Sequence, residues 1–273
     1  MSSIAPATRL NSRLIVQKSA STFASFSLKR QPSLARTAFL KQPTNIITKR
    51  YYNSPVKFRD NYENRNKILY TLIGSNFVIY SLWFVSESDA QLRMFMNKYF
   101  TISNYSFFQQ HLYFTTITSF FSHKDIAHIL FNMLALYTFG QTVIHMVGAP
   151  SFLALYFGGG VVSSLCQTLW PAVVPSHWPA RRNSSIYSRS LGASGAINAI
   201  VTWYIFLAPR SSIYIWGVLP VPAALFGVAY IGLDAYSLYF GGGDVGNAAH
   251  LGGAAFGALM FLLRRGRSSF RRF

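Results

Sequence analysis

The chain has 273 residues, of which 51% are hydrophobic and only 12% are charged, and its net charge is +18. This charged fraction is about half that of an average soluble domain, so the composition favours a membrane protein with several spans. The charge does not indicate nucleic-acid binding, because the Lys and Arg residues cluster at the two ends of the chain and form no basic face with interleaved aromatic residues.

The first 59 residues contain no Asp or Glu, and their basic residues are spread among Ser, Thr, Ala and Leu. This composition is typical of a mitochondrial transit peptide, and the segment lacks the apolar core of a secretory signal. The run Lys49–Ser54 resembles an arginine-directed processing site, so we expect maturation near Tyr51–Asn53. A disordered basic tail is the alternative interpretation.

Six apolar stretches of about 17 to 21 residues follow, each long enough to cross a hydrocarbon core of about 30 Å as a helix. They lie at 68–86, 125–145, 151–170, 191–208, 221–239 and 247–263. The sequence therefore predicts an all-α polytopic membrane protein, a six-transmembrane-helix bundle preceded by a disordered presequence. The expected divisions are a presequence at 1–52, a linker at 53–66, the six-helix core at 67–265 and a basic tail at 266–273.

An even number of spans places both ends of the core on one side of the membrane. That side carries ten Lys and Arg near the spans and the other side carries six. The positive-inside bias then predicts that both ends face the matrix of the mitochondrion.

Three polar residues are expected at similar depth on the opposite side. His128, Ser194 and His250 each lie about three residues inside the second, fourth and sixth stretches, which all enter the membrane from that side. Ionisable residues inside a membrane usually pair with one another and mark functional sites. Their matched side and depth predict one composite site.

A histidine within hydrogen-bond reach of a serine hydroxyl can act as the base that makes it a nucleophile. Asp234 and Asp244 are the acids nearest to His250 along the chain, but neither stands at a helical offset from it. A Ser–His dyad is therefore expected rather than a triad. His128 and Asn132, spaced i, i+4 on one helix face, are candidate oxyanion donors together with the Ser194 amide.

Each of these residues also has a structural interpretation. Ser194 between two glycines fits a close-packing position. His250 fits a hydrogen bond across helices, and His128 with Asn132 fits a tether for the first loop. The other histidines, His111, His123, His145 and His177, lie in loops or at span ends and are expected at the membrane interface. No cofactor is indicated, and no tetrahedral ligand set indicates a metal site.

The motifs around these residues resemble those of the rhomboid intramembrane serine proteases, in particular the mitochondrial branch. The matching segments are His128–Met133, Gly192–Gly195 and Ala249–Gly253 with Gly257, and weaker matches are Gly148, Phe152, Tyr156 and Leu219–Pro222. The resemblance covers about residues 120 to 265, and its three main motifs occur in the family's order.

The resemblance implies that Ser194 is the nucleophile and His250 the general base, with His128 and Asn132 at the oxyanion. It implies helix-packing roles for Gly192, Gly195, Gly253 and Gly257, and a mobile cap loop at Gly241–Gly243. It also implies cleavage of transmembrane helices of membrane-anchored proteins, including a dynamin-like GTPase, at the intermembrane-space face of the mitochondrial inner membrane. A catalytically inactive binder of transmembrane helices is the alternative. A proton-coupled transporter is disfavoured because we find no internal repeat.

The sequence departs from the family pattern in two places. Asn198 stands one helical turn after Ser194, where many members carry an aromatic residue under the histidine ring. This amide either orients His250 or bonds to a neighbouring helix. The first loop, about 87–124, also lacks the Trp-Arg pair common in bacterial relatives, so we expect substrate access to differ.

Overall fold

The computed structural model describes residues 62–183, 185–215, 217–240 and 246–270. The chain divides into two units, Met1–Thr48 and Lys49–Phe273, and every described residue lies in the second. The expected presequence at 1–52, its processing site and the glycine run at 241–243 lie outside the described residues.

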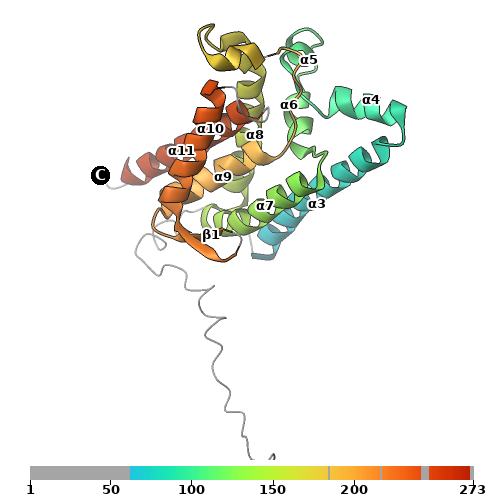
Figure 1. Cartoon of the computed structure of the whole chain (residues 1–273). Helices are drawn as coiled ribbons and strands as arrows, with labels where there is room; N and C mark the ends of the chain where they lie inside the picture. Colours follow the sequence, from blue (N-terminus) through green and yellow to red (C-terminus); the bar gives the residue numbers. More distant parts are fainter. Residues whose placement is uncertain (1–61, 184, 216, 241–245, 271–273) are drawn as a thin grey trace, which may run out of the picture. The chain divides into compact units, whose positions relative to one another are not determined.

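The described chain is almost entirely helical (Figure 1). In chain order, with the labels of Figure 1, the elements are α3 (Tyr62–Ser86), α4 (Ala90–Tyr99), α5 (Asn104–Phe108), α6 (Thr115–Thr118), η1 (Ser119–Phe121), α7 (Ile126–Val147), α8 (Ala149–Val173), η2 (Pro179–Asn183), α9 (Ser194–Leu207), β1 (Ser212–Ile215), β2 (Leu219–Pro222), α10 (Ala223–Phe240) and α11 (Asn247–Phe270).

Each of the six predicted apolar stretches coincides largely with one helix: α3, α7, α8, α9, α10 or α11. By length and hydropathy, α3, α7, α8 and α10 qualify as membrane spans among the described residues. The prediction of an all-α polytopic membrane protein is thus confirmed. The remaining two helices differ from ordinary spans, because α9 has only 14 residues and α11 is rich in Gly and Ala.

Helix α9 forms the centre of the bundle. Its residues Gly195 to Trp203 are all buried, which means that neighbours cover the helix on every side. A helix that is apolar all round is expected in such a position. Because α9 rises only about 21 Å over 14 residues, it ends short of a full hydrocarbon crossing.

Helix α3 begins at Tyr62, within the last part of the expected linker at 53–66. The first turn carries an exposed ion pair between Glu63 and Lys67, with 2.7 Å between Oε1 and Nζ. A helix extends beyond its apolar stretch where a water-facing turn holds charges at i, i+4. The hydrophobic stretch therefore marks the part of α3 that is expected inside the membrane, and the whole helix is longer than this stretch.

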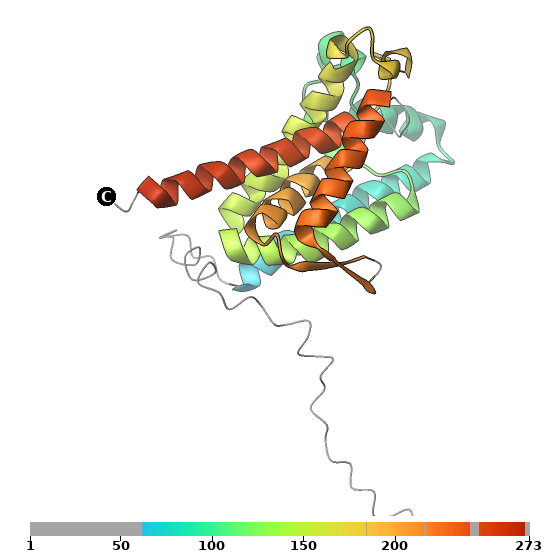
Figure 2. The ribbon, with the colours of Figure 1, turned by 60° about the vertical axis from the view of Figure 1, so that its left-hand side comes forward.

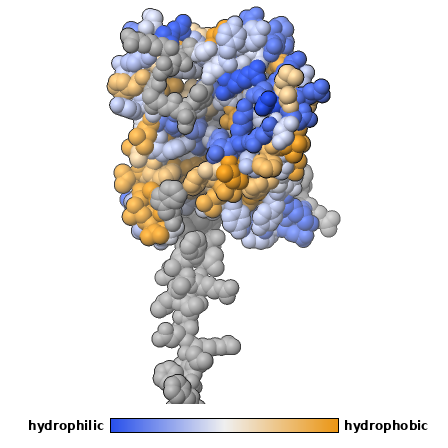
Figure 3. Space-filling view, turned by 45° about the vertical axis from the view of Figure 1, so that its right-hand side comes forward, coloured by the Kyte–Doolittle hydropathy of each residue, from blue (hydrophilic) through white to orange (hydrophobic). Residues whose placement is uncertain are grey.

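Helix α10 lies on the outside of the bundle (Figure 2). Only Ala223, Gly227 and Asp234 of this helix are buried, and they share one face. The opposite face exposes large apolar side chains, namely Leu225, Val228, Leu233 and Tyr236. Figure 3 shows how apolar side chains gather over the lower part of one face of the molecule. Such an exterior suits contact with lipid.

A short antiparallel hairpin connects α9 to α10. Strand β1 pairs with β2 in a register that places Ser212 opposite Pro222 and Ile215 opposite Leu219. Two of the four β2 residues are prolines, which lack the N–H that a further strand would need. The hairpin therefore ends as a two-stranded element.

Helices α9 and α11 approach until backbone meets backbone. A Cβ atom on Gly253 would lie 2.0 Å from the carbonyl oxygen of Gly195, and one on Gly257 would lie 2.2 Å from that of Ala199. Backbone carbonyls of a helix cannot move aside as a flexible side chain can. Glycine at both positions is therefore a geometric requirement of this packing.

We predict that Gly257→Ala destabilises the protein, because the added methyl group forces α11 away from α9. The expected loss is about 1 to 3 kcal/mol, the range seen for overpacked cores. The measurement is the midpoint of thermal unfolding in detergent micelles.

Gly232→Ala on α10 is the matched control, since no atom lies within 4 Å of a Cβ placed there. Its unfolding midpoint should be unchanged or slightly higher, as Ala favours helix. Equal midpoints for Gly257→Ala and Gly232→Ala would contradict the close-packing argument.

Candidate active site

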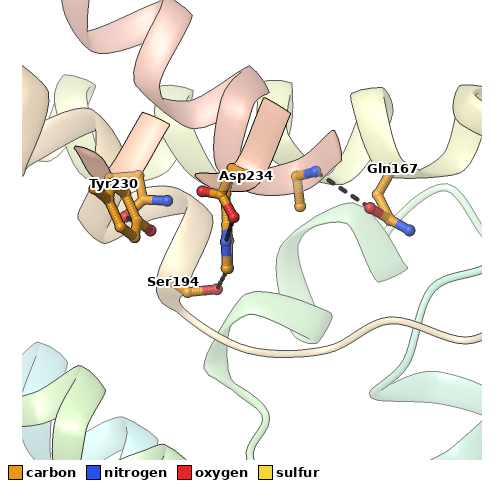
Figure 4. Close-up of polar contacts among 7 residues, drawn as sticks. Gln167, Ser194, Tyr230 and Asp234 are labelled. Carbon is orange, nitrogen blue, oxygen red and sulfur yellow. Dashed lines mark hydrogen bonds and ion pairs between the residues drawn. The ribbon is translucent and has the colours of Figure 1, made fainter. Parts of the chain in front are cut away.

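The N-terminal ends of α9 and α11 meet and bring Ser194 to His250. Ser194 is the first residue of α9 and His250 is the fourth of α11. The distance from His250 Nε2 to Ser194 Oγ is 2.8 Å, a hydrogen bond (Figure 4). The two motifs are 56 residues apart in the chain, and the glycine contacts between the two helices make this approach possible.

The neighbouring helix α8 contacts the N-terminal ends of both α9 and α11. A Cβ on Gly195 would collide with the Ser163 side chain, so α8 packs directly against the residue after Ser194. Gln167 Oε1 accepts a hydrogen bond of 3.2 Å from the Ala249 N–H, next to His250 (Figure 4). That amide lies in the first turn of α11 and has no partner within its own helix. The Gln167 side chain therefore caps this turn.

Gly192 has a different role from the one expected. It lies in the loop before α9 rather than in a helix, and its φ is +127°. A Cβ there would lie 2.8 Å from Cε1 of the His128 ring and 3.9 Å from Ser194 Oγ. Glycine is needed because the backbone takes a conformation that other residues rarely adopt. Its lack of a side chain leaves room for the His128 ring against the loop that leads into Ser194.

The first turns of α7 carry His128 and Asn132. Asp125 caps this helix, its side chain accepting a hydrogen bond of 2.9 Å from the His128 N–H. Asn132 is buried, and its Nδ2 donates to the carbonyl oxygen of His128 at 2.8 Å. An amide nitrogen carries two hydrogens, so one of them is left for a further acceptor. The Ser194 N–H, at the start of α9, has no acceptor within its helix.

His123 lies in the protein interior beside this group. It is completely buried, and its ring meets that of His128 edge to face, with centroids 4.9 Å apart. Burial, with His128 adding to it, lowers the pKa of His123 to about 3, so the ring is neutral at physiological pH. Its Nε2 accepts a hydrogen bond of 3.3 Å from the Ala193 N–H. His123 thereby holds the residue just before Ser194.

An acidic side chain that the sequence analysis did not place at the site also contacts His250. Asp234 Oδ1 lies 3.1 Å from His250 Nδ1, on the edge of the ring away from Ser194 (Figure 4). Asp234 belongs to α10 and His250 to α11, so a helical offset within one helix was the wrong criterion. The contact arises between helices, which sequence spacing does not describe.

Asn198 bonds to a neighbouring helix, the second of the two expected alternatives. Its Oδ1 accepts a hydrogen bond of 2.7 Å from the Tyr230 hydroxyl on α10. The Tyr230 ring in turn stacks on the His250 ring, with centroids 6.2 Å apart and planes 29° apart. An aromatic ring thus lies against the histidine, supplied by α10 instead of α9.

The arrangement provides a hydroxyl, a base bonded to it and nearby N–H groups, which are the parts that acyl transfer needs. Among the described residues, no three His, Cys, Asp or Glu side chains are grouped so that they could hold a metal ion.

Comparison with known proteins identifies the family to which the chain belongs. The rhomboid domain family matches residues 110–267. The chain is 36% identical to RHOMBOID-like protein 12, mitochondrial, of Arabidopsis thaliana over 73% of this chain and 59% of that protein. It is 32% identical to Rhomboid protein 1, mitochondrial, of Saccharomyces cerevisiae over 70% of this chain and 51% of that protein.

A third relative is the human Presenilin-associated rhomboid-like protein, mitochondrial, at 28% identity over 74% of this chain and 49% of that protein. The chain thus spans about half to three-fifths of the length of these curated relatives. The family match covers more than half of this chain and contains all the helices from α7 to α10. The chain therefore belongs to the rhomboid family, in its mitochondrial branch, and is a multi-pass membrane protein.

Proposed function

We propose that the protein is an intramembrane serine endopeptidase in which Ser194 is the nucleophile and His250 the general base. The observation that carries the proposal is the 2.8 Å hydrogen bond between Ser194 Oγ and His250 Nε2, within a bundle of membrane helices. A serine hydroxyl is a weak nucleophile until such a base removes its proton.

In the proposed reaction, Ser194 Oγ attacks the carbonyl carbon of the scissile peptide bond, and its proton passes to His250 Nε2. The carbonyl oxygen becomes an oxyanion that the Ser194 N–H, His128 and Asn132 stabilise. His250 then gives the proton to the departing amide nitrogen, which leaves an acyl ester on Ser194. A water molecule, deprotonated by His250, hydrolyses this ester and restores the serine.

The proposed substrates are transmembrane helices of membrane-anchored proteins, including a dynamin-like GTPase as the family resemblance suggests. A peptide bond within an intact helix is shielded by its own hydrogen bonds, so the substrate must unwind locally beside Ser194. The apolar exterior of the bundle lets such a helix approach through the lipid.

The proposed location is the mitochondrial inner membrane, after removal of the presequence at 1–52. Both ends of the six-helix core would face the matrix. The active site would then face the intermembrane space, because α7, α9 and α11 all begin on the side opposite those ends.

We predict that Ser194→Ala and His250→Ala both abolish cleavage of a fluorogenic transmembrane substrate by the purified protein. The double variant should be no worse than either single one, because the two residues act as a unit. The readout is kcat/KM in detergent or liposomes, with Ser75→Ala, on the exposed side of α3, as the control.

Cleavage that persists in both single variants would sink the protease proposal. Binding of a transmembrane peptide by a wild-type protein that does not cleave it would instead favour the inactive binder of transmembrane helices.

We predict that Asn132→Ala lowers kcat by about 10- to 1,000-fold with little change in KM, because an oxyanion donor acts mainly in the transition state. Thr142→Ala on the same helix removes only a contact of 3.4 Å with the Thr138 carbonyl and should leave kcat unchanged. A rise in KM at constant kcat would assign Asn132 to substrate binding instead.

For the topology, we predict that a tag fused after Phe273 resists protease in mitochondria stripped of their outer membrane. The excess of Lys and Arg on the side of the chain ends is the physical reason. Degradation of the tag under these conditions, with an intact matrix marker, would reverse the proposed orientation.

A further inference from the structure

Helix α10 contacts the proposed base at two points. His250 Nε2 faces Ser194, while Asp234 lies at Nδ1 and Tyr230 lies against the face of the ring (Figure 4). Asp234 and Tyr230 are spaced i, i+4, so they project from one face of α10. This side of α10 therefore contacts the His250 imidazole twice, at its Nδ1 edge through Asp234 and on its ring plane through Tyr230.

The Asp234 carboxylate is placed to select the tautomer of His250. A buried carboxylate is unfavourable unless it is paired. Within the described part of the chain, Oδ1 bonds to His250 Nδ1 and Oδ2 has no protein partner. An acceptor at Nδ1 favours the tautomer that carries its hydrogen there. Nε2 is then left as an acceptor, which is the state that can take a proton from Ser194.

The Tyr230 ring is held in place through Asn198. A ring stacked on an imidazole limits its rotation only if the ring itself cannot turn away. The hydroxyl of Tyr230 donates to Asn198 Oδ1 at 2.7 Å, and Asn198 is buried on α9, one turn after Ser194. The helix that carries the nucleophile thus fixes the ring that packs against the base.

We propose that Asp234 and Tyr230 are positioning residues that hold His250 in its reactive tautomer and orientation, with Asn198 as the anchor of Tyr230. The proposal rests on the proposed function, since it assigns these residues to the same site. It predicts a working unit of Asp234, His250 and Ser194, drawn from three helices, in place of the expected dyad.

A purely structural role is the competing explanation. Asp234 is one of the three buried residues of α10, so it also helps to dock this helix. Loss of docking would lower stability and raise KM. Loss of positioning would change which nitrogen of His250 carries the hydrogen and would lower kcat. The tautomer of His250 and kcat are therefore the quantities that separate the two explanations.

The first experiment reads the tautomer in the resting protein. Full-length protein labelled with 15N-histidine is studied by NMR in detergent micelles, and His250 is assigned by comparison with His250→Asn. In the wild type the hydrogen should be on Nδ1, and in Asp234→Asn both tautomers should be populated. An unchanged tautomer in Asp234→Asn would overturn the role of Asp234. This readout does not depend on activity, so it holds even if the protein does not cleave.

The second experiment measures kcat and KM with the transmembrane substrate. Asp234→Asn, which preserves shape, should lower kcat by about 100-fold or more, by analogy with triads in which the acid is replaced by its amide. Tyr230→Leu should lower kcat about 10-fold, whereas Tyr236→Leu on the exposed face of α10 should not. Equal kcat values for Tyr230→Leu and Tyr236→Leu would overturn the role of Tyr230.

The anchor is tested by a double-mutant cycle. Tyr230→Phe keeps the ring and Asn198→Ala removes its acceptor, so each should lower kcat a few-fold and the double variant should match the single ones. Additive losses would contradict the role of Asn198 as the anchor of Tyr230.

The two proposals fail in different ways. A wild-type protein that does not cleave the substrate would refute the proposed function. A wild-type protein that cleaves, together with an Asp234→Asn variant whose kcat and His250 tautomer are unchanged, would refute only this inference.

Discussion

The contact between the α9 and α11 backbones is the constraint on which the proposed site depends. The carbonyl oxygens of Gly195 and Ala199 occupy the space where Cβ atoms of residues 253 and 257 would lie. In lipid, helices gain little from the hydrophobic effect when they associate, so close packing and hydrogen bonds must hold them together. The same approach that stabilises the bundle sets the distance between Ser194 and His250.

The central position of α9 explains why its first turn can carry a polar site. Polar side chains inside a membrane are tolerated when they face protein and are bonded there. Here α7, α8 and α11 surround the start of α9, and each contributes a bonded polar side chain: Asn132, Gln167 or His250. The site is therefore enclosed by helices.

The sequence predicted the fold class well because apolar length and motif order are properties of the linear chain. All six stretches are helical, and the sequence alone predicts similar depth for His128, Ser194 and His250. The contacts of Asp234, Tyr230 and His123 were not predicted, because each joins different segments through a distance that spacing does not encode. Gly192 was assigned to helix packing for a similar reason, since its positive φ shows only in the folded loop.

Asn198 shows how one departure from a family pattern is balanced elsewhere in the fold. An aromatic residue at this position would pack under the histidine directly from α9. An amide cannot do so, but it can accept the hydroxyl of Tyr230, whose ring then reaches His250 from α10. This departure moves the aromatic support of His250 from the buried helix α9 to the outer helix α10. Because α10 is held by few buried residues, the orientation of His250 then depends on how firmly α10 is docked. The Asp234–His250 contact contributes to this docking, so the same carboxylate couples the position of a peripheral helix to the geometry of the base.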